Sequence, residues 1–277
     1  MHGQDETRAI AGDGVKAAMR IASVILACLL VAAPLAATAS ESGVKLDRMP
    51  ADINPNDPAS LQRGAQVYVN YCLGCHSASY MRYNRLKDFG LTDKQILDNL
   101  VFTGAKVGDL MTIAMTPKDA KEWFGAAPPD LSVIARSRSS GAGSGADWLY
   151  TYLRGFYRDP SRPTGWNNTA FPNVGMPHVL YALQGEQALK TVVEQMPRGN
   201  KGEFEKREVQ RLVLEKPGTM SPAEYDRLAA DLVNFLAYMA EPVRHYRQQV
   251  GIYVLIFLGL MFMLAYALKK EFWKDVH

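Results

Sequence analysis

The stretch that decides the fold is Cys72-Leu73-Gly74-Cys75-His76, a C-x-x-C-H motif. One turn of chain at this spacing places both thiols beneath the two vinyl groups of a porphyrin, while the adjacent imidazole reaches the iron. The motif occurs once, so we predict one covalently attached haem c. The alternatives are a thioredoxin-like dithiol, which needs a βαβ context not seen here, and a structural disulfide. Export of the chain favours haem over both.

The N-terminal residues have the layout of an export signal. Two basic residues precede an apolar run over residues 21–36, and a triplet of small and polar residues ends at Ala39. That order predicts a signal peptide over residues 1–39, cut after Ala39. An uncleaved membrane helix is the alternative, but the run is short and Pro34 interrupts it. We therefore expect Cys28 to be removed with the signal.

A second apolar run lies near the C-terminus. The segment from Val250 to Leu268 has no charged residue and as a helix would span roughly 28 Å, close to the thickness of the hydrocarbon core. We predict a transmembrane anchor over residues 246–269 and a cytoplasmic tail over 270–277, because lysines follow the run and the export signal places residues 40–245 outside. The chain is then a single-pass protein of a bacterial inner membrane, with its haem domain in the periplasm.

Composition excludes several classes of protein. The chain has 277 residues, 48% of them hydrophobic and 21% charged, with only three Cys, which excludes a disordered chain and a disulfide scaffold. Lys+Arg number 31 against 28 Asp+Glu without a basic stripe, so we predict no nucleic-acid partner. No Ser/His/Asp set, metal-protease helix or phosphate loop is present, and we expect no catalytic site of its own.

Apolar spacing predicts a mainly helical exported domain with long loops and few strands. Asp57-Pro58 is typical of a helix start, and the helical face that follows ends at Cys72. Segments 128–129, 139–145 and 157–177 are expected to be loops, the last one ordered and crowded with Pro, Gly, Asn and aromatic residues. Helices are expected over residues 57–72, 92–100, 116–124, 147–156 and 221–242.

The sixth position of a haem iron separates electron carriers from sensors and enzymes. Most Met residues of the exported domain are explained as core filler. Met176 differs because it lies between Gly175 and Pro177 in the ordered loop, where no helix dictates the direction of its side chain. His178 is its rival, and the residues alone leave both open. A thioether ligand raises the midpoint potential and a second imidazole lowers it.

Further segments resemble the cytochrome c1 family, the haem-c subunits of the ubiquinol–cytochrome c oxidoreductase or cytochrome bc1 complex. The resemblance extends from about Arg63 to the end of the chain. The Pro-Pro-Asp-Leu-Ser run and the Ala-Glu-Pro before the anchor are much more specific than the haem motif, which all haem-c proteins share. The matching segments are Cys72–Ser77, Met115–Ala120, Ala127–Ser132, Phe171–Pro177 and Ala240–Pro242.

The resemblance implies a class I cytochrome c-like haem domain with long loop insertions, plus one C-terminal transmembrane helix. It also implies thioether bonds at Cys72 and Cys75, and axial ligation by His76 and Met176. Some bacterial relatives carry another Cys pair near the axial Met. Here no Cys follows Cys75, so we expect Pro and aromatic residues to stiffen that loop.

Two more residues take an expected role from the resemblance. Pro129 would pack on the haem face, and Arg138 would pair with a haem propionate. The alternative for Arg138 is a solvated loop arginine.

The implied function is one-electron transfer without bond-making chemistry by the polypeptide. The chain would take electrons from a Rieske iron–sulfur protein and pass them to a soluble cytochrome c, within a dimeric membrane complex that also contains cytochrome b. One rival is a stand-alone membrane-tethered electron shuttle, which would share the motif and the anchor. Another is a haem sensor or peroxidase-type enzyme, which would need an open sixth site.

Overall fold

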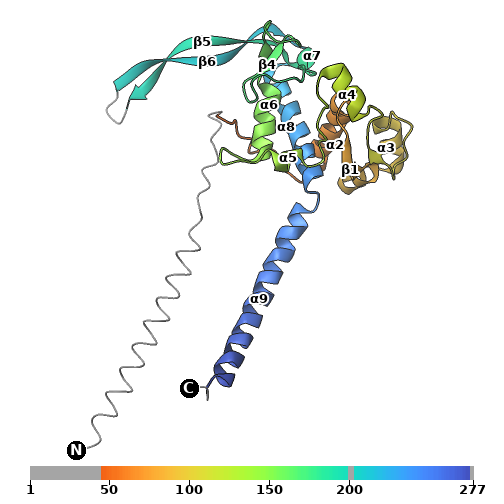
Figure 1. Ribbon diagram of the computed structural model, residues 1–277, viewed down its shortest axis with the longest axis vertical. Helices are drawn as coiled ribbons and strands as arrows, with labels where there is room; N and C mark the ends of the chain where they lie inside the picture. Colours follow the sequence, from red (N-terminus) through yellow and green to blue (C-terminus); the bar gives the residue numbers. More distant parts are fainter. Residues whose placement is uncertain (1–44, 199–202, 275–277) are drawn as a thin grey trace, which may run out of the picture. The chain divides into compact units, whose positions relative to one another are not determined.

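The computed structural model describes residues 45–198 and 203–274, so the predicted signal peptide and Cys28 lie outside the described residues (Figure 1). The first elements along the chain are α2 (Pro58–Val67), η1 (Tyr68–Cys72), β1 (Ala78–Arg82), η2 (Tyr83–Phe89), α3 (Asp93–Leu100), β2 (Leu110–Met111), α4 (Pro117–Phe124) and α5 (Ile134–Ser137). They are followed by α6 (Gly145–Arg154), β3 (Phe156–Arg158), β4 (Trp166–Asn168), α7 (Tyr181–Gln184), β5 (Gly185–Arg198), β6 (Glu203–Pro217), α8 (Pro222–Ala240) and α9 (Arg244–Phe272).

The core forms where α2 packs against α8, with α5 and α6 also on α8 (Figure 1). Capping residues set the N-terminal ends of both α2 and α8. Asp57 accepts hydrogen bonds from the backbone N–H groups of Ala59 and Ser60, and Ser221 forms a capping box with Glu224. The apolar face predicted for the first helix is buried as expected at Leu61, Ala65, Tyr68 and Cys72.

A glycine allows α2 and α8 to approach closely. A Cβ added at Gly64 would lie 2.1 Å from the Asp231 carbonyl oxygen and 2.7 Å from Phe235 Cβ. Beside this crossing, the buried Asp231 carboxylate accepts hydrogen bonds from Ser60 Oγ at 2.6 Å and from Arg63 Nε at 2.6 Å. A side chain at Gly64 would push the helices apart and lengthen these polar contacts.

The expectation of few strands is wrong for residues 185–198 and 203–217. Strands β5 and β6 pair antiparallel along their whole length as a two-stranded ribbon that leaves the helical core (Figure 1). Most of its side chains are partly or fully exposed, and ion pairs such as Lys190–Glu215 join the strands. Neither face of the ribbon is buried in a core, so its strands need no alternation of apolar and polar residues. That alternation is the pattern that indicates a strand in a sequence.

Two further boundaries differ from the sequence prediction. Helix α6 begins at Gly145 because Ser144 and Asp147 form a capping box, and it ends at Arg154 rather than at Phe156. Phe156 is instead the first residue of β3, which pairs antiparallel with β4. Part of the segment expected to be a loop is therefore a two-stranded sheet. The helices expected over 92–100 and 116–124 are present as α3 and α4.

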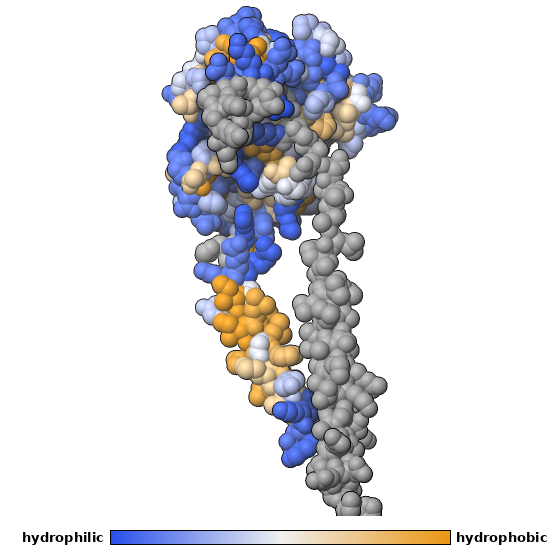
Figure 2. Space-filling model, turned by 90° about the vertical axis from the view of Figure 1, so that its left-hand side faces the viewer, coloured by the Kyte–Doolittle hydropathy of each residue, from blue (hydrophilic) through white to orange (hydrophobic). Residues whose placement is uncertain are grey.

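Helix α9 follows α8 after a short connection. Within the described part of the chain, one helix is long and apolar enough to cross a membrane, Tyr246–Phe272, with 27 residues and a mean hydropathy of 2.3 in its most apolar window. Figure 2 shows its hydrophobic band between hydrophilic ends. Its apolar side chains are exposed, as a lipid-facing helix requires.

We predict that Gly64→Ala lowers the free energy of unfolding by about 1–3 kcal/mol, because the added methyl group meets backbone atoms of α8. Thermal unfolding of the haem-loaded full chain in detergent measures this loss. Gly108→Ala is the matched control, since a Cβ there meets nothing within 4 Å. Equal stability of the two variants would contradict the close crossing.

Candidate haem site

The haem motif begins where α2 widens into a π turn. The Leu73 N–H donates to the Tyr68 carbonyl at 2.9 Å, and the N–H groups of Cys75 and His76 both donate to the Cys72 carbonyl. The motif is therefore one closed turn, and π turns occur frequently at functional sites. Cys72 and Cys75 are free thiols rather than a disulfide, and burial raises the pKa of Cys72 to about 12.

The His76 imidazole is held by Pro129. Its Nδ1 lies 2.7 Å from the Pro129 carbonyl oxygen. A carbonyl only accepts, so Nδ1 carries the proton and Nε2 keeps a free lone pair, as an iron ligand needs. Burial lowers the pKa of His76, although the hydrogen bond to Pro129 and the charge of Asp130 oppose this. Burial outweighs the two opposing effects, so the imidazole is mainly neutral near neutral pH.

Asp130 fixes the backbone that carries the Pro129 carbonyl. Its carboxylate accepts hydrogen bonds from the backbone N–H groups of Ser79 and Ser132, each at 2.8 Å. Burial opposes ionisation, but the hydrogen bonds from Ser132 and Ser79 hold the pKa of Asp130 below its usual range. The Pro-Pro-Asp-Leu-Ser segment is thus joined to the segment just after the haem motif.

Met176 lies in the loop that follows β4 and is partly exposed. It packs against a small cluster formed by Phe156, Trp166 and Val174. The Tyr152 hydroxyl donates to its Sδ at 3.3 Å. The thioether is thus held in place by α6 while part of the side chain remains accessible.

His178, the rival ligand, is used in protein packing. Its ring stacks on Phe156 at 4.7 Å between centroids and meets the Trp166 ring edge-on at 5.1 Å. The residue is 2% exposed, and within the described part of the chain its Nε2 has no hydrogen-bond partner. Burial lowers its pKa to about 4, with the Gln184 side chain opposing the shift, so the ring is neutral at physiological pH.

Asparagine side chains organise the loop that leads to Met176. Asn167 Oδ1 accepts from the N–H groups of Asn168 and Asn173, and Asn168 Oδ1 accepts from those of Ala170 and Phe171. Asn173 has a φ of 62°, a left-handed conformation that Asn tolerates better than most residues. The sequence analysis expected Pro and aromatic residues to stiffen this loop and did not predict the hydrogen bonds made by these two Asn side chains.

Arg138 is neither free nor fully solvated. Its guanidinium lies over the rings of Trp148 at 4.5 Å and Phe171 at 5.6 Å. Trp148 stacks on Tyr152, which in turn contacts Met176, so Arg138 and Met176 belong to one connected group of side chains. The solvated-loop alternative for Arg138 does not match these contacts.

The predicted residues thus form two internally connected groups. Cys72, Cys75, His76 and Pro129 make one, and Arg138 and Met176 belong to the other. Sequence reasoning missed Trp148 and Tyr152, which join the second group. Their signal was the i, i+4 spacing of Trp148, Tyr152 and Phe156, an aromatic face that is hard to tell from ordinary core packing.

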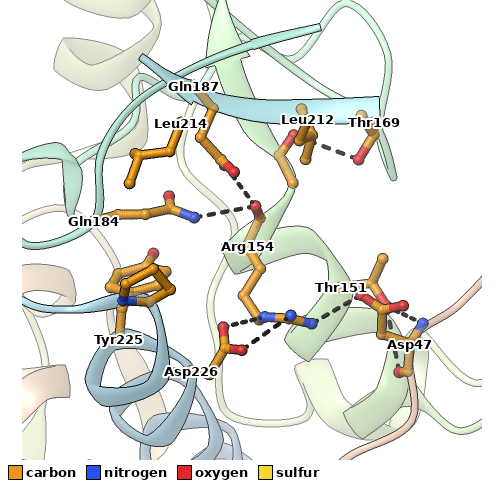
Figure 3. Close-up of a pocket in the computed structure, with 12 residues that line it drawn as sticks. Asp47, Thr151, Arg154, Thr169, Gln184, Gln187, Leu212, Leu214, Tyr225 and Asp226 are labelled. Carbon is orange, nitrogen blue, oxygen red and sulfur yellow. Dashed lines mark hydrogen bonds and ion pairs between the residues drawn. The ribbon is translucent and has the colours of Figure 1, made fainter. Parts of the chain in front are cut away.

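A cavity of about 330 Å³ lies at the base of the ribbon formed by β5 and β6, and the residues that line it hold several elements together (Figure 3). Its central Arg154 pairs with Asp226 through Nε at 2.5 Å and with Asp47 through Nη1 at 2.8 Å. The side-chain amides of Gln184 and Gln187 donate to the Arg154 carbonyl at 3.2 and 3.0 Å. These contacts join α6, α7, β5 and α8 to the N-terminal segment, and none of the predicted haem-binding residues lines the cavity.

Comparison with known proteins identifies the family. A model of the cytochrome C1 family matches residues 52–276. The chain belongs to the cytochrome c1 family. It is 49% identical to cytochrome c1 of Allochromatium vinosum over 92% of this chain and 99% of that one. It is 50% identical to the ammonia monooxygenase gamma subunit of Nitrosomonas europaea over 94% of this chain and 100% of that protein. Cytochrome c1 of Rhodospirillum rubrum is 28% identical over 92% of this chain and 97% of the relative.

Membership of the cytochrome c1 family makes this chain a haem c electron-transfer subunit of the bc1 complex, with one covalently attached haem. The residues present fit that group. Two free thiols lie on one turn, and an imidazole has its Nδ1 anchored and its Nε2 free. The partly exposed Met176 thioether is also present. The fold class expected from the sequence, a mainly helical haem domain with a C-terminal apolar helix, is confirmed.

We predict that Arg138→Gln lowers the free energy of unfolding by about 0.5–2 kcal/mol, because the guanidinium leaves the aromatic rings beneath it. Chemical unfolding monitored by tryptophan fluorescence would measure it. Arg136→Gln, at an exposed position on α5, is the matched control. Equal loss in both variants would show that the contact with Trp148 contributes nothing.

Proposed function

We propose that this chain carries single electrons from a Rieske iron–sulfur protein to a soluble cytochrome c, within a dimeric bc1 complex that includes cytochrome b. The observation that carries the proposal is the C-x-x-C-H turn with its Nδ1-anchored imidazole, in a chain matched to the cytochrome c1 family over residues 52–276. A haem c bound there supplies reversible one-electron chemistry. The protein's part is to hold the porphyrin and set its potential.

His76 Nε2 and Met176 Sδ are the proposed axial donors. His178 is disfavoured because Phe156 and Trp166 enclose its ring, and turning it toward an iron would break both contacts. Met176 remains partly accessible. Two protein ligands leave no open position for oxygen or peroxide, which disfavours a sensor or a peroxidase-type enzyme.

Cys72 and Cys75 are the proposed thioether attachment points, and Pro129 and Arg138 are proposed to act at the edges of the haem. The Pro129 carbonyl orients the His76 ring, and its pyrrolidine would pack on the haem face. Arg138, held over Trp148, offers a fixed positive charge for a propionate. A propionate bound there would be kept ionised, and its charge would be partly neutralised beside the porphyrin.

Helix α9 is the proposed membrane anchor, with its core at residues 246–269. Exposed Tyr246 and Trp273 lie near its two ends, where aromatic side chains favour the membrane interface. Lys269 and Lys270 in its last turn favour a cytoplasmic end. With the proposed signal peptide over residues 1–39, this arrangement leaves residues 40–245 in the periplasm and 270–277 in the cytoplasm.

The decisive experiment purifies the complex through a C-terminal tag in mild detergent. The proposal predicts that b-type haem co-purifies, visible in the reduced-minus-oxidised spectrum, and that the preparation reduces added cytochrome c with quinol. A lone c-type signal that persists in gentler detergents would favour the tethered shuttle. The name of the Nitrosomonas relative gives another outcome to exclude, ammonia-dependent reduction in place of quinol-dependent reduction.

We predict that Met176→Ala opens the iron to carbon monoxide and lowers the midpoint potential, because a thioether favours ferrous iron. His178→Phe is the matched control. It keeps a planar ring between Phe156 and Trp166 and removes a buried nitrogen without a partner, so the protein should fold and retain a closed iron. The reverse result, carbon monoxide binding only in His178→Phe, would reassign the sixth ligand to His178.

A further inference from the structure

We propose that Tyr152 is a positioning residue for Met176, whose hydroxyl orients the thioether for axial ligation and raises the midpoint potential of the bound haem. The inference rests on the proposed axial role of Met176. It concerns a contact that neither the haem motif nor the other family segments contain, because Tyr152 lies on α6, outside all of them.

The contact between the two side chains is direct. The Tyr152 hydroxyl lies 3.3 Å from Met176 Sδ, and the hydroxyl is the donor because a thioether only accepts. Sulfur of a thioether carries two lone pairs. With one of them engaged by the hydroxyl, the other is directed away from Tyr152 and remains available to a metal.

The Tyr152 ring is itself fixed on two sides. Trp148 stacks on it at 5.0 Å with an interplanar angle of 12°, and Phe156 meets it edge-on at 5.1 Å. Arg138 lies over the Trp148 ring at 4.5 Å. A hydroxyl on a ring held in this way has little freedom, so its direction determines where Sδ can lie.

Tyr152 also holds the loop through its backbone. Its carbonyl accepts a hydrogen bond from Asn168 Nδ2 at 2.8 Å. Asn168 in turn fixes the N–H groups of Ala170 and Phe171, a few residues before Met176. One residue of α6 therefore controls the loop at two points, one at its start and one at the thioether.

The expected effect on potential follows from charge. A hydrogen bond donated to Sδ withdraws electron density from the sulfur and makes it a weaker donor to ferric iron. Ferric haem is then destabilised relative to ferrous haem, so the potential rises. Removal of the hydroxyl alone should lower it.

The test compares Tyr152→Phe with Tyr150→Phe in the full haem-loaded chain. Phe at 152 keeps the ring between Trp148 and Phe156, and Tyr150 lies on nearly the opposite side of the same helix. At a fixed ambient potential, we expect the ferrous-to-ferric ratio of Tyr152→Phe to fall about two- to tenfold, where tenfold is 59 mV for one electron. Tyr150→Phe should match the unaltered chain. An unchanged or raised potential in Tyr152→Phe would overturn the proposal.

A double-mutant cycle separates this role from a purely structural one. In a Met176→His background the sulfur is absent, so Tyr152→Phe should no longer shift the potential. An equal shift in both backgrounds would show that the hydroxyl acts elsewhere and would overturn the proposal.

Failure of the ligand assignment gives a different result. If Met176→Ala opens the iron but Tyr152→Phe changes nothing, only the role of Tyr152 is wrong. If Met176→Ala leaves carbon monoxide binding unchanged, the ligand assignment and the role of Tyr152 both fail.

Discussion

The crossing of α2 on α8 at Gly64 is the constraint on which the rest of the domain depends. The C-terminal end of α2 carries the haem motif, while the C-terminal end of α8 leads into the apolar helix α9. The close backbone approach of Gly64 to Asp231 also buries a carboxylate that Ser60 and Arg63 must satisfy. A buried charge is tolerated only with such partners, so packing and electrostatics specify one relative placement of the two helices.

The half of the site that holds Met176 is stabilised by side-chain hydrogen bonds and aromatic packing rather than by a helix crossing. A loop without regular structure must satisfy its backbone polar groups by other means, and here two adjacent Asn side chains supply acceptors for four N–H groups. Arg162 adds hydrogen bonds to both the carbonyl and the side chain of Asn173. Because no covalent bridge closes this loop, the position of the thioether depends on these hydrogen bonds and on the aromatic face of α6.

The features that were predicted correctly depend on residues that lie close together in the sequence. The C-x-x-C-H spacing, the caps at Asp57 and Ser221 and the buried face of α2 were all predicted from residues a few positions apart. The hairpin was missed because a ribbon exposed on both faces has no alternation to detect. The anchoring of His76 by Pro129 joins residues 53 positions apart, and the contact of Tyr152 with Met176 joins residues 24 apart. Neither separation has a periodic signature.

Packing supports the proposal of Met176 rather than His178 as the axial ligand, a choice that composition leaves open. Both residues lie in one loop, and imidazole is an equally ordinary haem ligand. Phe156 is the residue on which our proposal of Met176 depends, because it covers the face of the His178 ring and also contributes to the apolar cluster against which Met176 packs. Release of His178 toward an iron would expose Phe156 and break the edge contact with Trp166, whereas Met176 is already partly exposed. A side chain that is already partly exposed loses less packing on binding an iron than one that must first leave the core.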